Sequence, residues 1–268
     1  MGTAYISLAR FWNTASLMGS AALNRRRSDI PDFIQTNVSI DSLADEIFSR
    51  YAGEQEVIVD GSPYTTTYFL RGYCPDFRVM KLAGELALRV NQQAAQEQEA
   101  ENGLSPLRIT VRDIMLAALL HDLGKQHEDC APFLELLKHK DLRSDQRQLL
   151  EIVRDVHCRK GPCMIDRLKD AGRKELSNPF VSTVARRHGE DYQTNRSATQ
   201  GCWWAREINV ITIADDYDAM VSEGPERAYK LDNVTPKDAV TLLRKGVERG
   251  RYEPSITDIF IADVLRLS

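Results

Sequence analysis

A histidine followed directly by an aspartate, His121-Asp122, stands at the end of a strongly apolar segment. The apolar residues of this segment recur at helical spacing, so we expect a buried helix that begins near Val111. An unpaired carboxylate is costly to bury, and a divalent metal beside it removes that cost. Imidazole and carboxylate both bind such metals, and adjacent residues can meet on one ion where a helix ends. The alternative is an aspartate that caps the next turn beside an ordinary core histidine.

Three later residues follow the same pattern, namely His157, His188 and Asp215. Each follows an apolar run, and we expect each to lie where a buried segment leaves the core. A single histidine at a helix end is more often a partner of the helix dipole than a metal ligand. Four such positions in order favour a metal site. His127 and His139 fall outside the series.

The order and spacing of these residues resemble the HD superfamily of metal-dependent phosphohydrolases. Within that superfamily the chain looks like the HD-GYP branch, the cyclic di-GMP phosphodiesterases, and the resemblance covers about residues 65 to 268. The motifs that carry it are the following: His121-Asp122-Leu123-Gly124-Lys125, His157 four residues before Gly161, His188, Ala214-Asp215 with Asp218, Arg227-Ala228-Tyr229-Lys230, and Gly250-Arg251-Tyr252-Glu253-Pro254.

The resemblance implies an all-α fold, with an HD-type helical bundle over residues 65–268 and an N-terminal extension of unknown role over residues 1–64. It also implies one or two divalent ions (Fe, Mn or Mg), weakly held. Asp122 would be shared, with His121 and Asp215 on one ion and His157 and His188 on the other.

Four residues are implied in binding and turnover of a phosphate ester. Asp122 and Lys125 would be catalytic. Lys125, Arg227 and Lys230 would contact substrate phosphate, because ammonium and guanidinium groups pair with phosphate oxygens. For Lys125, a solvent-exposed lysine at a helix end is nearly as good an interpretation.

Two of the family's expected ligands are absent. Pro75 stands where the family has its first metal-binding histidine, and Cys74 or Asp76 is near enough in sequence to replace it. Arg187 stands where the family has one of two adjacent histidines. A cation there opposes a second metal, but Arg187 could hold a phosphate directly. The Gly-Tyr-Pro signature is also missing, with residues 190–195 in its place.

Three functions therefore remain open. The first is a divergent cyclic di-GMP phosphodiesterase, which we favour. The second is a metal-dependent hydrolase of another nucleotide or phosphate ester. The third is a silent module on the same fold that binds a nucleotide or a signalling protein partner.

Composition is consistent with a cytoplasmic protein. The chain has 268 residues, a net charge of −4 and five scattered cysteines. The mild acidity argues against broad nucleic-acid binding, and no apolar run is long enough to insert into a membrane. Cys158 and Cys163 flank a predicted loop beside His157, and we expect both to be ordinary buried thiols in preference to a third metal site.

The remaining pattern is mainly helical. We expect helices over residues 38–51 and 77–93, and a short strand at residues 56–60. Thr110 with Asp113 should cap the helix that ends in His121-Asp122, and Thr235 should cap a late helix.

Overall fold

The computed structural model describes residues 39–51, 57–59, 62–64, 75–97, 104–127, 129–130, 143–197, 203–222 and 234–267. All of them belong to the second of the chain's two units, residues 35–268. Helices dominate, which confirms the all-α class. The strands described are β1 (Val57–Val59) and β2 (Ser62–Tyr64), which pair antiparallel with Val57 opposite Tyr64. The predicted short strand is thus present, with a partner.

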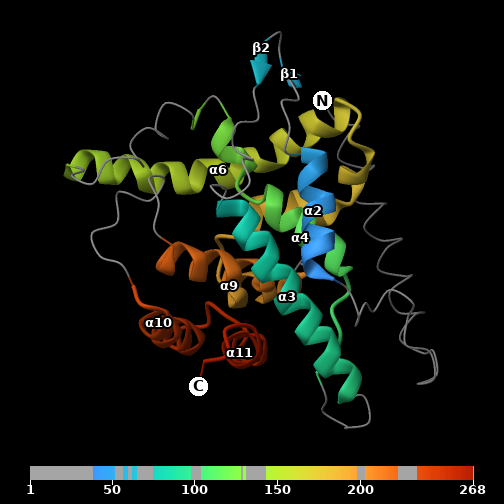
Figure 1. The fold of residues 1–268 in the computed structure, drawn as a ribbon. Coiled ribbons are helices and arrows are strands. Elements are labelled where there is room, and N and C mark those ends of the chain that lie inside the picture. Colours follow the sequence, from blue (N-terminus) through green and yellow to red (C-terminus); the bar gives the residue numbers. More distant parts are fainter. Residues whose placement is uncertain are drawn as a thin grey trace. The chain divides into compact units, whose positions relative to one another are not determined.

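Figure 1 shows the arrangement of the helices. Their bounds are α2 (Ile40–Tyr51), α3 (Pro75–Gln96), α4 (Val111–Leu120), α6 (Ser144–Asp170), α7 (Pro179–Arg187), α8 (Tyr192–Ser197), α9 (Ala205–Val221), α10 (Pro236–Glu248) and α11 (Pro254–Ile259). Three shorter helical turns are η2 (Leu123–Gln126), η4 (Lys174–Ser177) and η6 (Phe260–Val264).

Helix α4 lies at the centre of the core. Eight of its ten residues are buried, which is typical of a helix that is covered on all sides. It packs against α2, α3, α7 and α9, while α3 also packs on α9 and α6 packs on α7 and η2 (Figure 1). The C-terminal end of α4, where His121-Asp122 follows, is therefore surrounded by helices from distant parts of the sequence.

The cap of α4 is the one that the sequence predicts. The Thr110 side chain accepts a hydrogen bond from the Asp113 backbone N–H at 3.1 Å and donates one to the Asp113 carboxylate at 2.9 Å. Thr235 caps α10 in the same way through Asp238. Both caps satisfy backbone N–H groups that the first helical turn leaves free, so they fix where each helix begins.

Helix α2 is part of the same core although it precedes residue 65. Its buried residues Ile40, Ala44, Ile47 and Phe48 belong to the hydrophobic cluster formed by α3, α4, α7 and α9. The Phe48 ring also meets the Phe77 ring of α3 edge to face at 4.8 Å. This helix is thus packed with the domain. The prediction of a separate extension over residues 1–64 otherwise stays a prediction.

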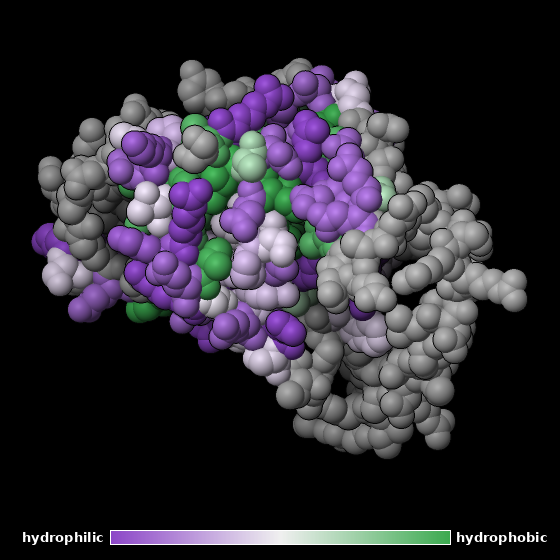
Figure 2. Space-filling view, turned by 90° about the horizontal axis from the view of Figure 1, so that it is seen from below, coloured by the Kyte–Doolittle hydropathy of each residue, from purple (hydrophilic) through white to green (hydrophobic). Residues whose placement is uncertain are grey.

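Figure 2 shows a face on which hydrophilic side chains surround a smaller apolar area. The large apolar side chains that are exposed in the described ranges are Ile152, Trp203 and Leu242. Of the helices described, none is both long enough and apolar enough to cross a membrane.

Candidate metal centre

Three buried histidines point the same ring nitrogen into one site. His121, His157 and His188 are each at most 6 % exposed. In each, Nδ1 lies within hydrogen-bond distance of a carbonyl oxygen one turn earlier: Ala118 at 2.7 Å, Val153 at 2.9 Å and Val184 at 3.1 Å. A carbonyl only accepts, so Nδ1 carries the proton and donates it. The lone pair of Nε2 is then free to face the site, as metal-binding histidines require.

Asp122 lies between these imidazoles and presents a different oxygen to each side. Its Oδ1 is 3.1 Å from Nε2 of His157 and 3.6 Å from Nε2 of His188. Its Oδ2 is 3.5 Å from Nε2 of His121 and also accepts a hydrogen bond from Nζ of Lys125. Asp215 on α9 completes the second side, with Oδ1 3.5 Å from Nε2 of His121. The five predicted ligands therefore come together around Asp122.

Two features show that a cation fits this site. Nε2 of His121 is buried and has no hydrogen-bond partner. Nε2 of His157 and Nε2 of His188 lie 3.2 Å apart, so two lone pairs face each other unless one is protonated. Buried polar atoms are rarely left unpaired, because an atom without a partner has lost its hydrogen bonds to water and gains none in return. A divalent ion would bind these nitrogens and relieve both problems, so the residues present fit such an ion.

The charges of the site point the same way. Burial lowers the pKa of His121, but Asp122 and Asp215 outweigh burial and raise it to about 9. The pKa values of His157 and His188 are also raised, against the effect of burial, mainly by Asp122 and Cys158. The carboxylates thus draw positive charge into the site. Protons supply that charge when no metal does.

Asp122 itself is held in its ionised form. Burial alone would raise its pKa, but Lys125, His121 and the other two imidazoles lower it well below the usual range. The pKa of Lys125 is in turn raised, because Asp122 and Asp215 outweigh its burial. Lys125 is therefore a charged partner of Asp122 and is not the solvent-exposed lysine of the alternative interpretation.

Two glycines allow the ligand-bearing elements to approach closely. A Cβ at Gly124 in η2 would overlap the carbonyl oxygen of His157 and lie 2.7 Å from the backbone nitrogen of Gly161. A Cβ at Gly161 in α6 would lie 2.9 Å from Cβ of Ala185 in α7. Glycine at these positions brings the His-Asp pair, His157 and His188 within reach of one another. This explains why a glycine follows each of the first two ligand positions.

Two ion pairs hold α9 in place beside the site. Asp218 accepts hydrogen bonds from Arg78 of α3, at 2.9 Å from Nε and 3.4 Å from Nη2. Asp216, next to Asp215, accepts hydrogen bonds from Arg251 at 2.6 Å and from the Tyr252 hydroxyl at 2.7 Å. The C-terminal motif that contains Arg251 and Tyr252 thus positions the helix that carries Asp215.

The local structure differs from the sequence prediction at two ligands. His157 does not end a helix: α6 continues from Ser144 to Asp170 through Gly161 and Pro162. Asp215 likewise lies inside α9, which ends at Val221. The prediction of helix ends was wrong there, because a polar side chain inside a helix can face the site if its face is buried against the other ligand-bearing elements.

The other predicted site residues have mixed outcomes. The Arg187 guanidinium pairs with Glu190, with Nε 3.3 Å from Oε2, and no contact with the histidine cluster is found for it among the described residues. Arg227 and Lys230 lie outside the described residues, as does Cys74. Asp76, the other suggested replacement for the missing histidine, is buried in the first turn of α3. Burial raises its pKa to about 6, and His121, Asp122, Lys125 and Asp215 also act on it.

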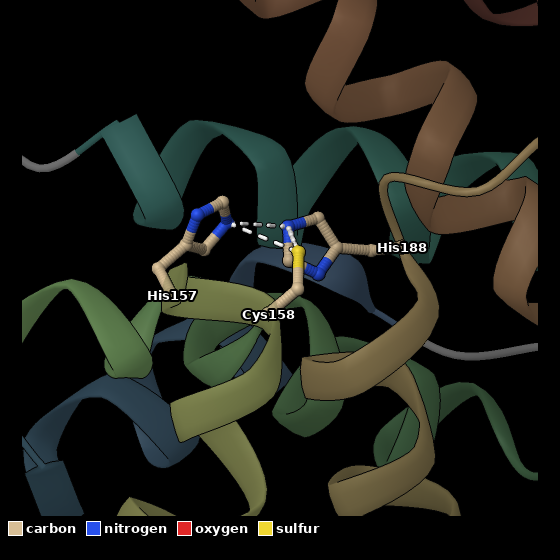
Figure 3. A group of neighbouring side chains, drawn as sticks. All are labelled: His157, Cys158 and His188. Carbon is tan, nitrogen blue, oxygen red and sulfur yellow. Dashed lines mark hydrogen bonds between the residues drawn. The ribbon is translucent and has the colours of Figure 1, made fainter. Parts of the chain in front are cut away.

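Cys158 is the residue that sequence reasoning missed. It lies in α6 and not beside a loop, and its Sγ is 3.4 Å from Nε2 of His157 and 3.9 Å from Nε2 of His188. Figure 3 shows the three side chains pointing toward one another. Burial would raise the pKa of the thiol, but the two imidazoles lower it to about 6. The sequence offered one signal, the adjacency of Cys158 to a predicted ligand.

The chain belongs to the HD domain family, because the model of that family matches residues 77–220. This match covers every residue of the cluster except Asp76. HD membership together with the His/Asp cluster indicates a metal-dependent phosphohydrolase. Comparisons with curated proteins and with solved structures found no match.

Metal binding at pH 7 should release protons. The raised pKa values of His121, His157 and His188 mean that the metal-free site holds protons there, and a metal must displace them. Metal affinity should therefore fall as the pH drops below the pKa of His121, about 9, because protons then compete with the metal for the ring nitrogens. Calorimetric titration in two buffers with different ionisation heats measures the release, and identical heats at pH 7 would contradict it.

Proposed function

We propose that this protein is a metal-dependent phosphodiesterase, with cyclic di-GMP as the leading substrate. The observation that carries the proposal is the convergence of three imidazole Nε2 atoms on the two oxygens of one buried carboxylate, Asp122. Donor atoms of this kind, with their lone pairs directed at one point, suit a divalent cation. Phosphodiester hydrolysis by an HD domain is the chemistry that a divalent ion in it would serve.

The residues would divide the work as follows. His121, Asp122 and Asp215 would hold one ion, and His157 and His188 with Asp122 would hold another. A divalent ion supplies a Lewis acid that stabilises the negative charge of the phosphate oxygens in the transition state. Lys125 would keep Asp122 ionised and oriented through its contact with Oδ2. Asp76, whose pKa burial raises to about 6, would be a group able to take up or release a proton near these residues.

The choice of cyclic di-GMP rests on the sequence resemblance to HD-GYP domains and not on the family match. Two features support it: the Arg227-Ala228-Tyr229-Lys230 element, and the C-terminal Gly250–Pro254 element, whose Arg251 and Tyr252 bind Asp216 beside a proposed ligand. The losses at Pro75 and Arg187 make a slow enzyme the expectation.

A substrate panel tests the proposal. Metal-free protein is loaded with Mn²⁺, Fe²⁺ or Zn²⁺ and incubated with cyclic di-GMP, bis-p-nitrophenyl phosphate and nucleoside monophosphates, with Asp122→Asn as the blank. Metal-dependent cleavage of the diesters that the blank lacks supports the proposal. Cleavage of the monoesters alone would favour the second function, and cyclic di-GMP binding without any turnover would favour the silent module.

Arg227→Ala should weaken cyclic di-GMP binding about ten- to a hundredfold. A guanidinium pairs with phosphate without help from a metal, and such a charge-assisted contact is worth roughly 1.5–3 kcal/mol. Calorimetric binding to metal-free protein measures the effect, and Arg249→Ala, at the exposed arginine that follows α10, is the matched control. Unchanged affinity in Arg227→Ala would remove this residue from the substrate site.

A further inference from the structure

The sulfur of Cys158 lies beside the ring nitrogens of two histidines, which simple packing of a thiol in the core does not require. Its sulfur faces two buried imidazoles whose Nδ1 protons are both committed to backbone carbonyls (Figure 3). The three donor atoms lie within 4.8 Å of one another. Cys163, five residues further along the same helix, is by contrast exposed and contacts none of these groups in the described structure.

The distances fit a tetrahedral ion. Bonds of about 2.0–2.1 Å to nitrogen and about 2.3 Å to sulfur separate two nitrogens by about 3.3 Å, and a nitrogen from a sulfur by about 3.6 Å. The His157–His188 nitrogen pair is 3.2 Å apart, and the sulfur lies 3.4 and 3.9 Å from these nitrogens. Oδ1 of Asp122 lies 3.1 and 3.6 Å from the same two nitrogens, so a carboxylate stands beside the imidazole pair.

We infer that Cys158, His157 and His188 form a three-donor, thiolate-containing site that selects a thiophilic divalent ion such as Zn²⁺. Metal binding displaces to solvent the protons that the imidazoles and the thiol of this group hold, and no change of oxidation state is involved. The inference deepens the proposed function, since it names the ligands and the ion of one of its two metal positions. Its test does not depend on turnover.

The thiolate also accounts for Arg187. The resembled family has a second histidine at that position, whereas here the arginine pairs with Glu190. Cys158 of α6 supplies the third ligand instead, so this ligand comes from α6 and not from α7. A thiolate in place of an imidazole adds negative charge, which offsets part of the repulsion of a nearby cation, and it shifts the preference from Mg²⁺ or Mn²⁺ towards Zn²⁺.

Cobalt substitution tests this ligand set directly. Metal-free wild type, Cys158→Ser and Cys163→Ser are titrated with Co²⁺, and near-ultraviolet and visible absorption are recorded. Wild type and Cys163→Ser should show thiolate-to-cobalt charge-transfer absorption and the strong visible bands of a tetrahedral site. Cys158→Ser should lose the charge-transfer absorption and bind Zn²⁺ at least about tenfold more weakly. Thermal unfolding of the metal-free variants shows whether each is folded.

The outcomes separate this inference from the proposed function. Cobalt binding by wild type without charge-transfer absorption would overturn the thiolate site while leaving the metal-dependent hydrolase in place. The same holds if Cys158→Ser keeps that absorption. If wild type binds no cobalt at all, both the thiolate site and the metal-dependent function fail. If Cys158→Ser unfolds, the preference for Zn²⁺ over Mn²⁺ is measured by competition in wild type and in Cys158→Ala. Loss of this preference in Cys158→Ala supports the site, and an unchanged preference would overturn it.

Discussion

Asp122→Ala is expected to remove most of the metal from the protein and at least about a hundredfold of its hydrolytic activity. Asp122 lies within 3.6 Å of Nε2 of all three imidazoles, because its two oxygens face opposite sides of the site. Even outer partners of metal ligands change affinity or activity by about 10–100-fold, and a shared ligand should matter more. Elemental analysis of protein purified without chelator measures the loss of metal.

Two further variants test whether the loss of metal is specific to the Asp122 carboxylate. Asp122→Asn keeps the volume of the side chain but removes its charge, so it should also lose metal. Asp258→Ala replaces an exposed aspartate on α11 and should retain the wild-type content. Equal metal content in wild type and Asp122→Ala would refute the ligand assignment.

Gly124→Ala should destabilise the fold by about 3 kcal/mol, the upper part of the range for overpacking. The added methyl group would overlap the carbonyl oxygen of His157 and press on the backbone nitrogen of Gly161. Neither atom can move without shifting α6, because both belong to its backbone. A domain of this size should lose about 6–12 °C in Tm, as measured by circular dichroism.

Gly189→Ala is the matched control for this effect. Its Cβ would meet only Sγ of Cys158, at an ordinary contact distance of 3.7 Å, so its Tm should change little. If Gly124→Ala and Gly189→Ala have the same Tm as wild type, close packing of η2 on α6 does not hold the site together.

The sequence predicted the helical class and the residues that meet at the site, for identifiable reasons. The apolar positions around α4 repeat at helical spacing, and Thr110 marks where the helix starts. The His-Asp pair was informative because a buried carboxylate requires a cation. These signals are local, and each can be recognised within one or two helical turns.

What the sequence did not predict depends on packing between distant elements. Cys158 becomes important only because α7 places His188 opposite it. His157 and Asp215 look like helix ends in sequence, since a polar residue interrupts an apolar run. They lie inside longer helices whose polar positions face the site. No spacing rule within one segment reveals such a juxtaposition.

The central claim is that the cluster around Asp122 binds a divalent metal. Crystals of the protein soaked with Zn²⁺, with diffraction collected on both sides of the zinc absorption edge, test it most directly. The account predicts an anomalous peak about 2.0–2.1 Å from Nε2 of His157 and of His188, with an oxygen of Asp122 at similar distance. A fully soaked crystal in which these nitrogens have no anomalous peak between them, while zinc is bound elsewhere, would contradict it.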